Sequence, residues 1–489
     1  MIRKSRLAIL AVAALALGAG SASAGGVLRV TQPDEPAGLD ATVANAAAIA
    51  GALLYNTMET LVQVNDEGGL EPLLAESWDV SDDGLIYVFN IREGVKWHDG
   101  SDMTLDDVIW TFEYGRTEGN VQGFAFADID TIEATGPNQM TVTLKSPNSS
   151  FLTNMAKRSG FILAERFKED QHGAPVGTGP FRFVEWNRGE NMIFERFDDY
   201  WGTPAKLDGI EWTYIPDANA EMNALLAGDI DAVQALNAKS RVGELREPEF
   251  VVESGAITSV HILSINHEVA PFDNPRIRQA LFHAIDGQAI VDGMNNGFGT
   301  ATRTFASPLD AYFDPTYDPY PYDPAKAREI LKEEGMEGLE VEIQAILDNP
   351  GIRQAEIVLG QLFAAGFRPT VKGFDLGTGL ASMIQNRTYE IATIGLISER
   401  ILRMTCDAYW FQNYCNEEFD AHMARALTAS DPEEIKAAYL DAIHHLADDA
   451  AIVPFYTDVR VGVHRDYVTG WRPVHPDSVL DLRNVDMVE

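Results

Sequence analysis

The sequence predicts an α/β protein of two or three domains, and two observations carry this prediction. Strand-like and helix-like segments alternate between residues 339 and 394, which is the pattern of an α/β domain. The chain has 489 residues, of which 46% are hydrophobic, so it is long enough to build several separate cores. Neither an internal repeat nor a low-complexity segment interrupts it.

The first 24 residues are predicted to be a secretion signal. Three cations stand near its start, residues 7–18 form a short apolar run, and Ala22-Ser23-Ala24 is a small-x-small cleavage site. A membrane anchor is the alternative, but the apolar run is short for crossing a bilayer. No cysteine follows the cleavage site, so no lipid attachment is expected. The sequence therefore predicts a mature chain that begins near Gly25 and is free in a periplasm.

The N-terminal third is predicted to contain a strand, a helix and a strand–turn–helix unit. Residues 27–31 form the first strand, and residues 45–61 form a helix with one apolar side. A turn at residues 81–84 is favoured by its aspartates and glycine, and β-branched and aromatic residues predict a strand at 85–91. Thr104 is predicted to cap the next helix, because two aspartates follow it in the first turn, ahead of an apolar face.

Further along, alternating strands at residues 181–186 and 191–196 flank a turn and predict a hairpin. Pro275 is predicted to start a helix, because its missing N–H costs nothing at the first helical position. The remaining elements are predicted from the same apolar periodicities. They are strands at residues 130–134, 140–144, 207–215, 229–233, 260–266, 339–346, 369–373, 389–394 and 452–456, and helices at 219–226, 354–365 and 432–446, with one more after Tyr322.

The charge balance is strongly acidic. With 37 Lys+Arg against 74 Asp+Glu the net charge is −37, and without the three leader cations 34 against 74 leaves −40. Such a surface repels nucleic acid and anionic membranes, so neither is an expected partner. It could favour a cationic ligand, but the simpler interpretation is an acidic, salt-adapted surface, because bulk charge governs solubility more than it defines a site.

The chain has two cysteines, Cys406 and Cys415. In an oxidising compartment a bridge between them is predicted, which would close a short loop and contribute about 2–3 kcal/mol. Two free buried thiols are the alternative. A metal site is less favoured, because structural zinc sites usually need four ligands near one another.

Three further stretches and one helix end carry a resemblance to a known family. Residues 73–110 read LLAESWDVSDDGLIYVFNIREGVKWHDGSDMTLDDVIW, and Gly177 opens the run GTGPFRFVEWNRGENMIFERFDDYWG. Residues 271–286 read PFDNPRIRQALFHAID, and YNTMETLV occupies residues 55–62. These motifs resemble the family 5 extracellular solute-binding proteins, the peptide- and nickel-binding receptors of ABC importers. The resemblance spans nearly all of residues 27–470.

The resemblance implies a periplasmic-binding-protein type II-like fold, in which two main lobes surround a ligand cleft and an extra small α/β domain lies beside them. Three domains are therefore expected after the signal at 1–24. The implied boundaries are 25–55, 177–258 and 466–489 for the first lobe, 56–176 for the peripheral domain, and 259–465 for the second lobe.

No enzyme motif is present. The sequence lacks G-x-S-x-G, H-E-x-x-H, a P-loop and C-x-x-C. His98-Asp99 could form an acid–base pair, but in the matching motif the pair lies in a turn, which favours a structural role. His444 and His445 lie on divergent faces of one helix and neither has a histidine four residues away. Neither a metal nor a cofactor is therefore expected.

By the same resemblance, four segments line the cleft: residues 32–35, 264–267, 303–304 and 398–410. The last is the strongest candidate, because it places carboxylates, guanidinium groups and aromatic rings within thirteen residues. A small zwitterion needs that mixture. The predicted ligand-binding residues are Gln32, Asp34, Asn266, Arg303, Arg400, Arg403, Asp407, Tyr409 and Trp410. Dipeptide-binding members of the family carry a short-range disulfide near the position of Cys406 and Cys415.

The fourth segment departs from the pattern of the peptide receptors, and only its end, NYCNEEFD from Asn413, matches well. The predicted function is a monomeric periplasmic receptor that captures a small solute, peptide-like by preference. Hinge closure would trap the solute for delivery to an ABC permease. A receptor for an opine, a sugar, a nickel chelate or haem is the first alternative. A secreted enzyme or chaperone on the same scaffold is the second.

Overall fold

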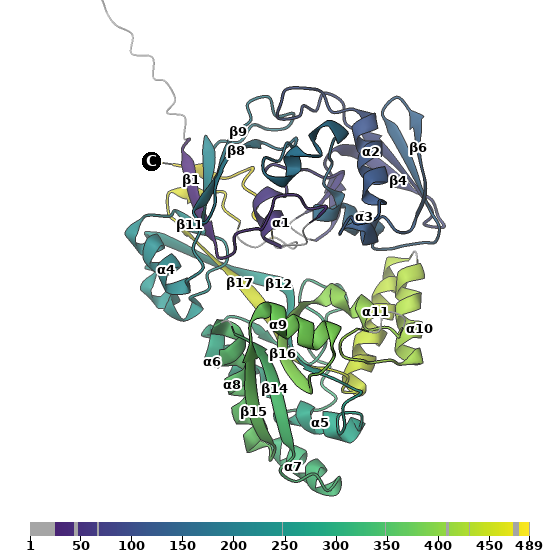
Figure 1. The fold of residues 1–489 in the computed structure, drawn as a ribbon, viewed down its shortest axis with the longest axis vertical. Coiled ribbons are helices and arrows are strands. Elements are labelled where there is room, and N and C mark those ends of the chain that lie inside the picture. The colour runs from purple at the N-terminus through teal and green to yellow at the C-terminus, as the bar shows by residue number, and fades with distance from the viewer. Residues whose placement is uncertain are drawn as a thin grey trace, which may run out of the picture.

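The computed structural model describes residues 25–43, 47–65, 68–246, 248–347, 349–406, 410–429, 431–472 and 479–488. The predicted signal lies outside these ranges, and so do Asp407 and Tyr409. The chain forms an upper and a lower body, which two long strands connect (Figure 1). Among the described residues, every helix is too short or too polar to cross a bilayer.

One eleven-stranded sheet runs through both bodies, in the order β15-β14-β16-β12-β17-β11-β1-β10-β9-β8, with β13 beside β17. Its upper strands are β1 (Val27–Gln32), β8 (Phe181–Asn187), β9 (Asn191–Arg196), β10 (Gly209–Tyr214) and β11 (Ala232–Val233). Its lower strands are β13 (Thr300–Ala301), β14 (Glu340–Ile346), β15 (Arg368–Phe374) and β16 (Ile391–Ile397). The connecting strands are β12 (Phe250–Ile265) and β17 (Val453–Arg465).

The connecting strands β12 and β17 pair with each other in both bodies. Residues 250–256 of β12 pair with the end of β17, and residues 260–263 pair with its start while residues 259–265 also pair with β16 of the lower body. Between Ala256 and Val260 the β12–β17 ladder shifts register. Such an irregularity bends a strand pair and increases its twist. The passage between the two bodies is therefore a bent two-stranded connection.

The upper body is completed by α1 (Ala47–Leu53), α4 (Ala218–Ala227) and the C-terminal pair β18 (Val468–Thr469) and β19 (Asp486–Met487). Its core joins Trp212 of β10 to Leu480 and Leu482 from the end of the chain. The chain thus leaves this body through β12 and returns to it through β17.

A smaller antiparallel sheet, in the order β4-β5-β7-β6, lies beside the upper body (Figure 1). Its elements are β4 (Ala75–Val80), β5 (Ile86–Ile91), β6 (Ile129–Gly136) and β7 (Gln139–Leu144), with β2 (Val62–Val64), β3 (Leu70–Pro72), α2 (Leu105–Gly115) and α3 (Phe151–Met155) around it. Phe89, Trp97 and Phe112 belong to a core of its own. The predicted cap of α2 is confirmed, because Thr104 and Asp107 form a reciprocal capping box.

The lower body carries most of the helices around β14, β15 and β16. They are α5 (Pro275–Ala284), α6 (Gly287–Asn295), α7 (Pro324–Glu333), α8 (Asn349–Ala364), α9 (Leu376–Leu380), α10 (Glu417–Thr428) and α11 (Pro432–Asp448). Helices α10 and α11 form a hairpin below the smaller sheet (Figure 1), and Met423 and Ile443 lie in the core between them and β12. Ser149 Oγ lies 3.5 Å from Ala426 O, which brings the hairpin to the edge of the smaller sheet's domain.

The helix predicted at residues 45–61 is too long, because α1 ends at Leu53. Tyr55 has φ +64°, residues 55–57 form a turn, and this turn is hydrogen-bonded to the segment that leads into β8. Gly179 N donates to Thr57 O at 3.1 Å and Phe181 N donates to Asn56 O at 2.9 Å. These tertiary hydrogen bonds override the local helical periodicity. The predicted hairpin is confirmed as β8 and β9.

Candidate functional site

Two of the quoted motifs meet at one buried carboxylate, Glu59, whose exposure is 1%. Its Oε2 accepts hydrogen bonds from Thr178 Oγ1 at 2.8 Å and from Trp201 Nε1 at 2.9 Å. Its Oε1 accepts from Tyr200 OH at 2.8 Å. Burial raises the pKa of Glu59, and the three donors oppose that shift by favouring the charged form. This cluster joins the upper body to the smaller domain.

His98 completes the same junction. Gly177 N donates to its Nδ1 at 3.2 Å, and its Nε2 donates to Gly179 O at 2.9 Å. Burial lowers the pKa of His98 to about 4, so the ring is neutral at physiological pH. A Cβ on Gly177 would lie 1.9 Å from Thr57 O, so this approach requires glycine. The geometry favours the structural interpretation of His98 over an acid–base role.

A small cavity of about 20 Å³, partly open to solvent, lies between the loop that follows β1 and the smaller domain. Residues 39–42 form one wall, and Thr111 and Tyr114 of α2 form another. Arg158 brings a positive charge to it, and Asp40 a negative one.

Two guanidinium groups from opposite bodies, those of Arg158 and Arg400, interact electrostatically. Arg158 begins the 3₁₀ turn η2 (Arg158–Gly160) and lines the cavity, whereas Arg400 lies in the 3₁₀ turn η7 (Ser398–Arg403) that follows β16. Burial lowers the pKa of Arg158, and the positive charge of Arg400 lowers it further. Their charges are therefore close enough to repel. A carboxylate between them would turn that repulsion into two attractions, since guanidinium groups bind carboxylates through paired hydrogen bonds.

The segment after η7 contains the predicted disulfide, which is confirmed between Cys406 and Cys415. Cys406 N donates to the two carboxylate oxygens of Asp420 on α10, at 3.1 and 3.3 Å. The bridged loop is thereby anchored to the α10–α11 hairpin. Trp410 is half-buried and packs edge-on against Phe411, with ring centroids 4.4 Å apart. Asp407, Tyr409 and the side chain of Arg403 lie outside what the structure describes.

Asn266 is fully buried at the end of β12. Its Nδ2 donates to Arg387 O and to Tyr389 O, both at 3.0 Å. Its Oδ1 accepts from Glu268 N at 3.2 Å and from Asn413 Nδ2 at 2.7 Å. All four hydrogen-bonding positions of the amide are therefore used inside the lower body.

Arg303 also faces into the lower body. Its Nη2 donates to Phe282 O at 3.1 Å and to Tyr320 O at 3.0 Å, and burial lowers the pKa of Arg303. Gln32 ends β1 on the way to the cavity and donates to Asp34 O at 2.7 Å. The side chain of Asp34 is exposed. The structure thus uses Asn266 and Arg303 for internal hydrogen bonds of the lower body, and Trp410 packs against the apolar residues of that body.

Sequence reasoning missed the cavity residues Asp40, Thr42 and Arg158. Thr42 N and Oγ1 both donate to Asp40 Oδ1, at 2.8 and 2.6 Å, which is a local turn pattern that the D-x-T spacing could have indicated. Arg158 stands in an ordinary K-R-S-G stretch, and its proximity to Arg400 depends on the packing of the two bodies. No local signal in the sequence could have identified it.

A receptor that binds a small solute between two lobes is the class of protein that this fold indicates, because two bodies are joined by a bent two-stranded connection. The chain matches the family described as bacterial extracellular solute-binding proteins, family 5 middle, over residues 69–401. It belongs to that family, whose members serve ABC importers.

Similar proteins agree with this assignment. A glutathione-binding protein GsiB from Pectobacterium atrosepticum is 29% identical over 447 residues, which cover 85% of this chain and 86% of the relative. The DppA periplasmic binding protein from Helicobacter pylori, solved in complex with the peptide STSA, is 26% identical, with a TM-score of 0.83 over 95% of this chain and 98% of that one. NikA from Brucella suis, solved with Fe(III)-EDTA, shares the fold with a TM-score of 0.84, 22% identity and coverage of 94% and 99%.

Proposed function

We propose that this receptor captures a peptide-like solute in the periplasm, after removal of residues 1–24, and delivers it as a monomer to an ABC permease of the inner membrane. The relatives named for glutathione and for a bound peptide support the ligand class. Both ligands are peptides that carry free carboxylates. The whole chain has a net charge of −37, so positive groups beside the cavity stand out against a predominantly acidic protein.

The observation that carries the proposal is the electrostatic interaction between Arg158 and Arg400, which belong to opposite bodies. In the proposed complex a ligand carboxylate lies between the two guanidinium groups. Arg158 is held by the upper side of the cleft, and Arg400 moves with the lower body. One carboxylate would therefore contact both lobes at once and would favour the closed form over the open one.

The β12–β17 connection is the proposed hinge. Its ladder is irregular between Ala256 and Val260, and a second shift lies between His261 and Ile262. A few residues at such a point can absorb the change in backbone angles that closure needs. The two bodies would then move as rigid units about β12 and β17.

The residues proposed to bind the ammonium end of the ligand are taken from the sequence prediction. Asp407 is proposed to bind the ligand ammonium, and Trp410 to form an aromatic wall beside it. The disulfide from Cys406 to Cys415 encloses both residues and restricts the loop that presents them. Half-burial of Trp410 next to Phe411 is compatible with this role.

Mass spectrometry of the ligand released from protein purified out of a periplasmic extract tests the proposal. A small peptide with a free carboxylate is expected, together with a protein mass that starts near Gly25. An opine would retain the arginine pair but change the ligand class, whereas a sugar, haem or a nickel chelate without a peptide would contradict the proposal. Conversion of the recovered compound by the purified protein would favour an enzyme.

A further inference from the structure

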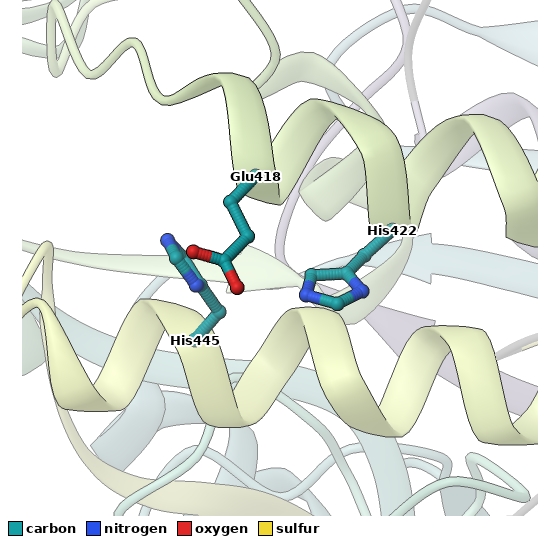
Figure 2. A group of neighbouring side chains, drawn as sticks. All are labelled: Glu418, His422 and His445. Carbon is teal, nitrogen blue, oxygen red and sulfur yellow. The ribbon is translucent and has the colours of Figure 1, made fainter.

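A cluster of metal-ligating side chains lies on the α10–α11 hairpin and includes neither Arg158 nor Arg400. Glu418 and His422 project from α10, and His445 projects toward them from α11 (Figure 2). One ligand atom from each residue lies within 4.8 Å of the other two. We propose that Glu418, His422 and His445 bind a divalent transition-metal ion of the zinc class.

The helical geometry explains why these residues converge. Glu418 and His422 are four residues apart, so they lie on one face of α10. His445 lies near the end of α11, which runs back along α10 after a short connection. A tetrahedral zinc ion with bonds of about 2.0–2.1 Å would place its ligand atoms about 3.3 Å apart. Small rotations about the side-chain torsions would bring the three atoms to that spacing.

His445 supplies a second observation. Its Nε2 is buried and has no hydrogen-bond partner among the described residues. A buried polar atom without a partner is costly, and coordination to a cation would satisfy it. The neighbouring His444 is occupied elsewhere, since its Nε2 lies 3.2 Å from Asp314 Oδ2 and its ring stacks on Tyr317 at 3.7 Å. Only His445 of this pair faces α10.

The composition of the cluster selects the ion. Glu418 is the acidic member of the cluster. Another carboxylate of the hairpin, Asp441, forms an ion pair with Arg425 of α10. Two imidazoles and one carboxylate suit zinc, whereas calcium and magnesium prefer oxygen ligands alone. Three protein ligands leave one position for water. The sequence predicted no metal here because it compared His445 only with residues of its own helix.

A bound ion would fasten the first turn of α10 to the last turns of α11. Asp420 in the same turn of α10 accepts the hydrogen bonds from Cys406 N, so this turn also anchors the disulfide loop. Because the folded hairpin assembles the site, the ion would stabilise the native state by mass action. Its effect is independent of the ligand proposed for the cleft.

Calorimetric titration of the tag-free, EDTA-treated mature protein with ZnCl₂ tests the site. One ion per chain is expected. His422→Ala and His445→Ala should each weaken zinc binding by at least about 10- to 100-fold, because losing even a residue that only hydrogen-bonds to a metal ligand costs that much. Glu418→Gln should weaken it as well. His444→Ala is the matched control, and its zinc affinity should equal that of the wild type.

Thermal unfolding monitored with and without zinc separates binding from folding defects. Zinc should raise the melting temperature of the wild type and of His444→Ala, and should leave that of the His422→Ala/His445→Ala double variant unchanged. Absence of zinc binding to the folded wild-type protein would overturn the proposal. So would a double variant that binds zinc with wild-type affinity, because the ion would then lie elsewhere.

Discussion

Replacing Glu59 by alanine should be among the most destabilising single changes in this chain. The carboxylate is buried and accepts hydrogen bonds from Thr178, Tyr200 and Trp201 at 2.8–2.9 Å. Alanine would leave three donors without an acceptor in the junction between the upper body and the smaller domain. Each buried donor without a partner costs about 1–3 kcal/mol.

The net loss is smaller than the sum of those three costs. Burial raises the pKa of Glu59, which means that the folded state carries a desolvation penalty for the charge. Removing the carboxylate relieves that penalty, and water can enter the space left by the side chain. These opposing effects lead us to expect that Glu59→Ala lowers the free energy of unfolding by about 3–4 kcal/mol.

Glu59→Gln is the discriminating control. An amide oxygen in place of Oε2 would still accept from Thr178 and Trp201, and the amide NH₂ could donate to the hydroxyl oxygen of Tyr200. We therefore expect a loss of about 1 kcal/mol for glutamine. Equilibrium urea unfolding, followed by tryptophan fluorescence, measures both values. A loss below about 1 kcal/mol for alanine, or equal losses for the two variants, would refute this account of the junction.

Three other predictions concern Asp407 in the loop between Cys406 and Cys415, the disulfide between these two cysteines, and Glu221 of α4. Asp407→Ala should weaken binding of a zwitterionic ligand by about 100-fold or more and leave the melting temperature of the empty protein nearly unchanged; calorimetry that finds a change under about threefold would contradict it. Alkylation of the unreduced, denatured protein should label neither Cys406 nor Cys415, and replacing both by serine should lower stability by about 2–3 kcal/mol. Burial raises the pKa of Glu221 to about 7, so ionisation destabilises the fold as pH rises from about 4.5 through 7. Glu221→Gln should remove this loss and be more stable than wild type at pH 8, by up to about 3 kcal/mol in urea unfolding, and equal stabilities there would contradict the assignment.

Helix caps and hairpins that depend on residues near one another in the chain were predictable from the sequence. The cap at Thr104 depends on residues within one turn, and the β8–β9 hairpin depends on alternation around its own turn. The long strands β12 and β17 were predicted only in part. The first half of β12 is largely exposed, so it lacks the apolar alternation by which a strand is recognised.

The site was less predictable than the fold, because its residues converge only through tertiary packing. Arg400 could be chosen from the chemistry of its segment, but Arg158 stands 242 positions earlier and in another body. Asn266 was predicted to line the cleft from its position in the family pattern, and its amide has four partners within the lower body. The direction in which a side chain points at a strand end depends on neighbours that are distant in sequence.

Calorimetric titration with the recovered ligand and with the same ligand carrying carboxamides in place of its carboxylates tests the central claim most directly. Wild type and Arg116→Ala, an exposed arginine of the same domain, should bind the acid form at least about 100-fold more tightly than the amide. Arg158→Ala and Arg400→Ala should lose most of that preference. Equal affinities of the wild-type protein for acid and amide would contradict the claim that a carboxylate between these two arginines holds the lobes together.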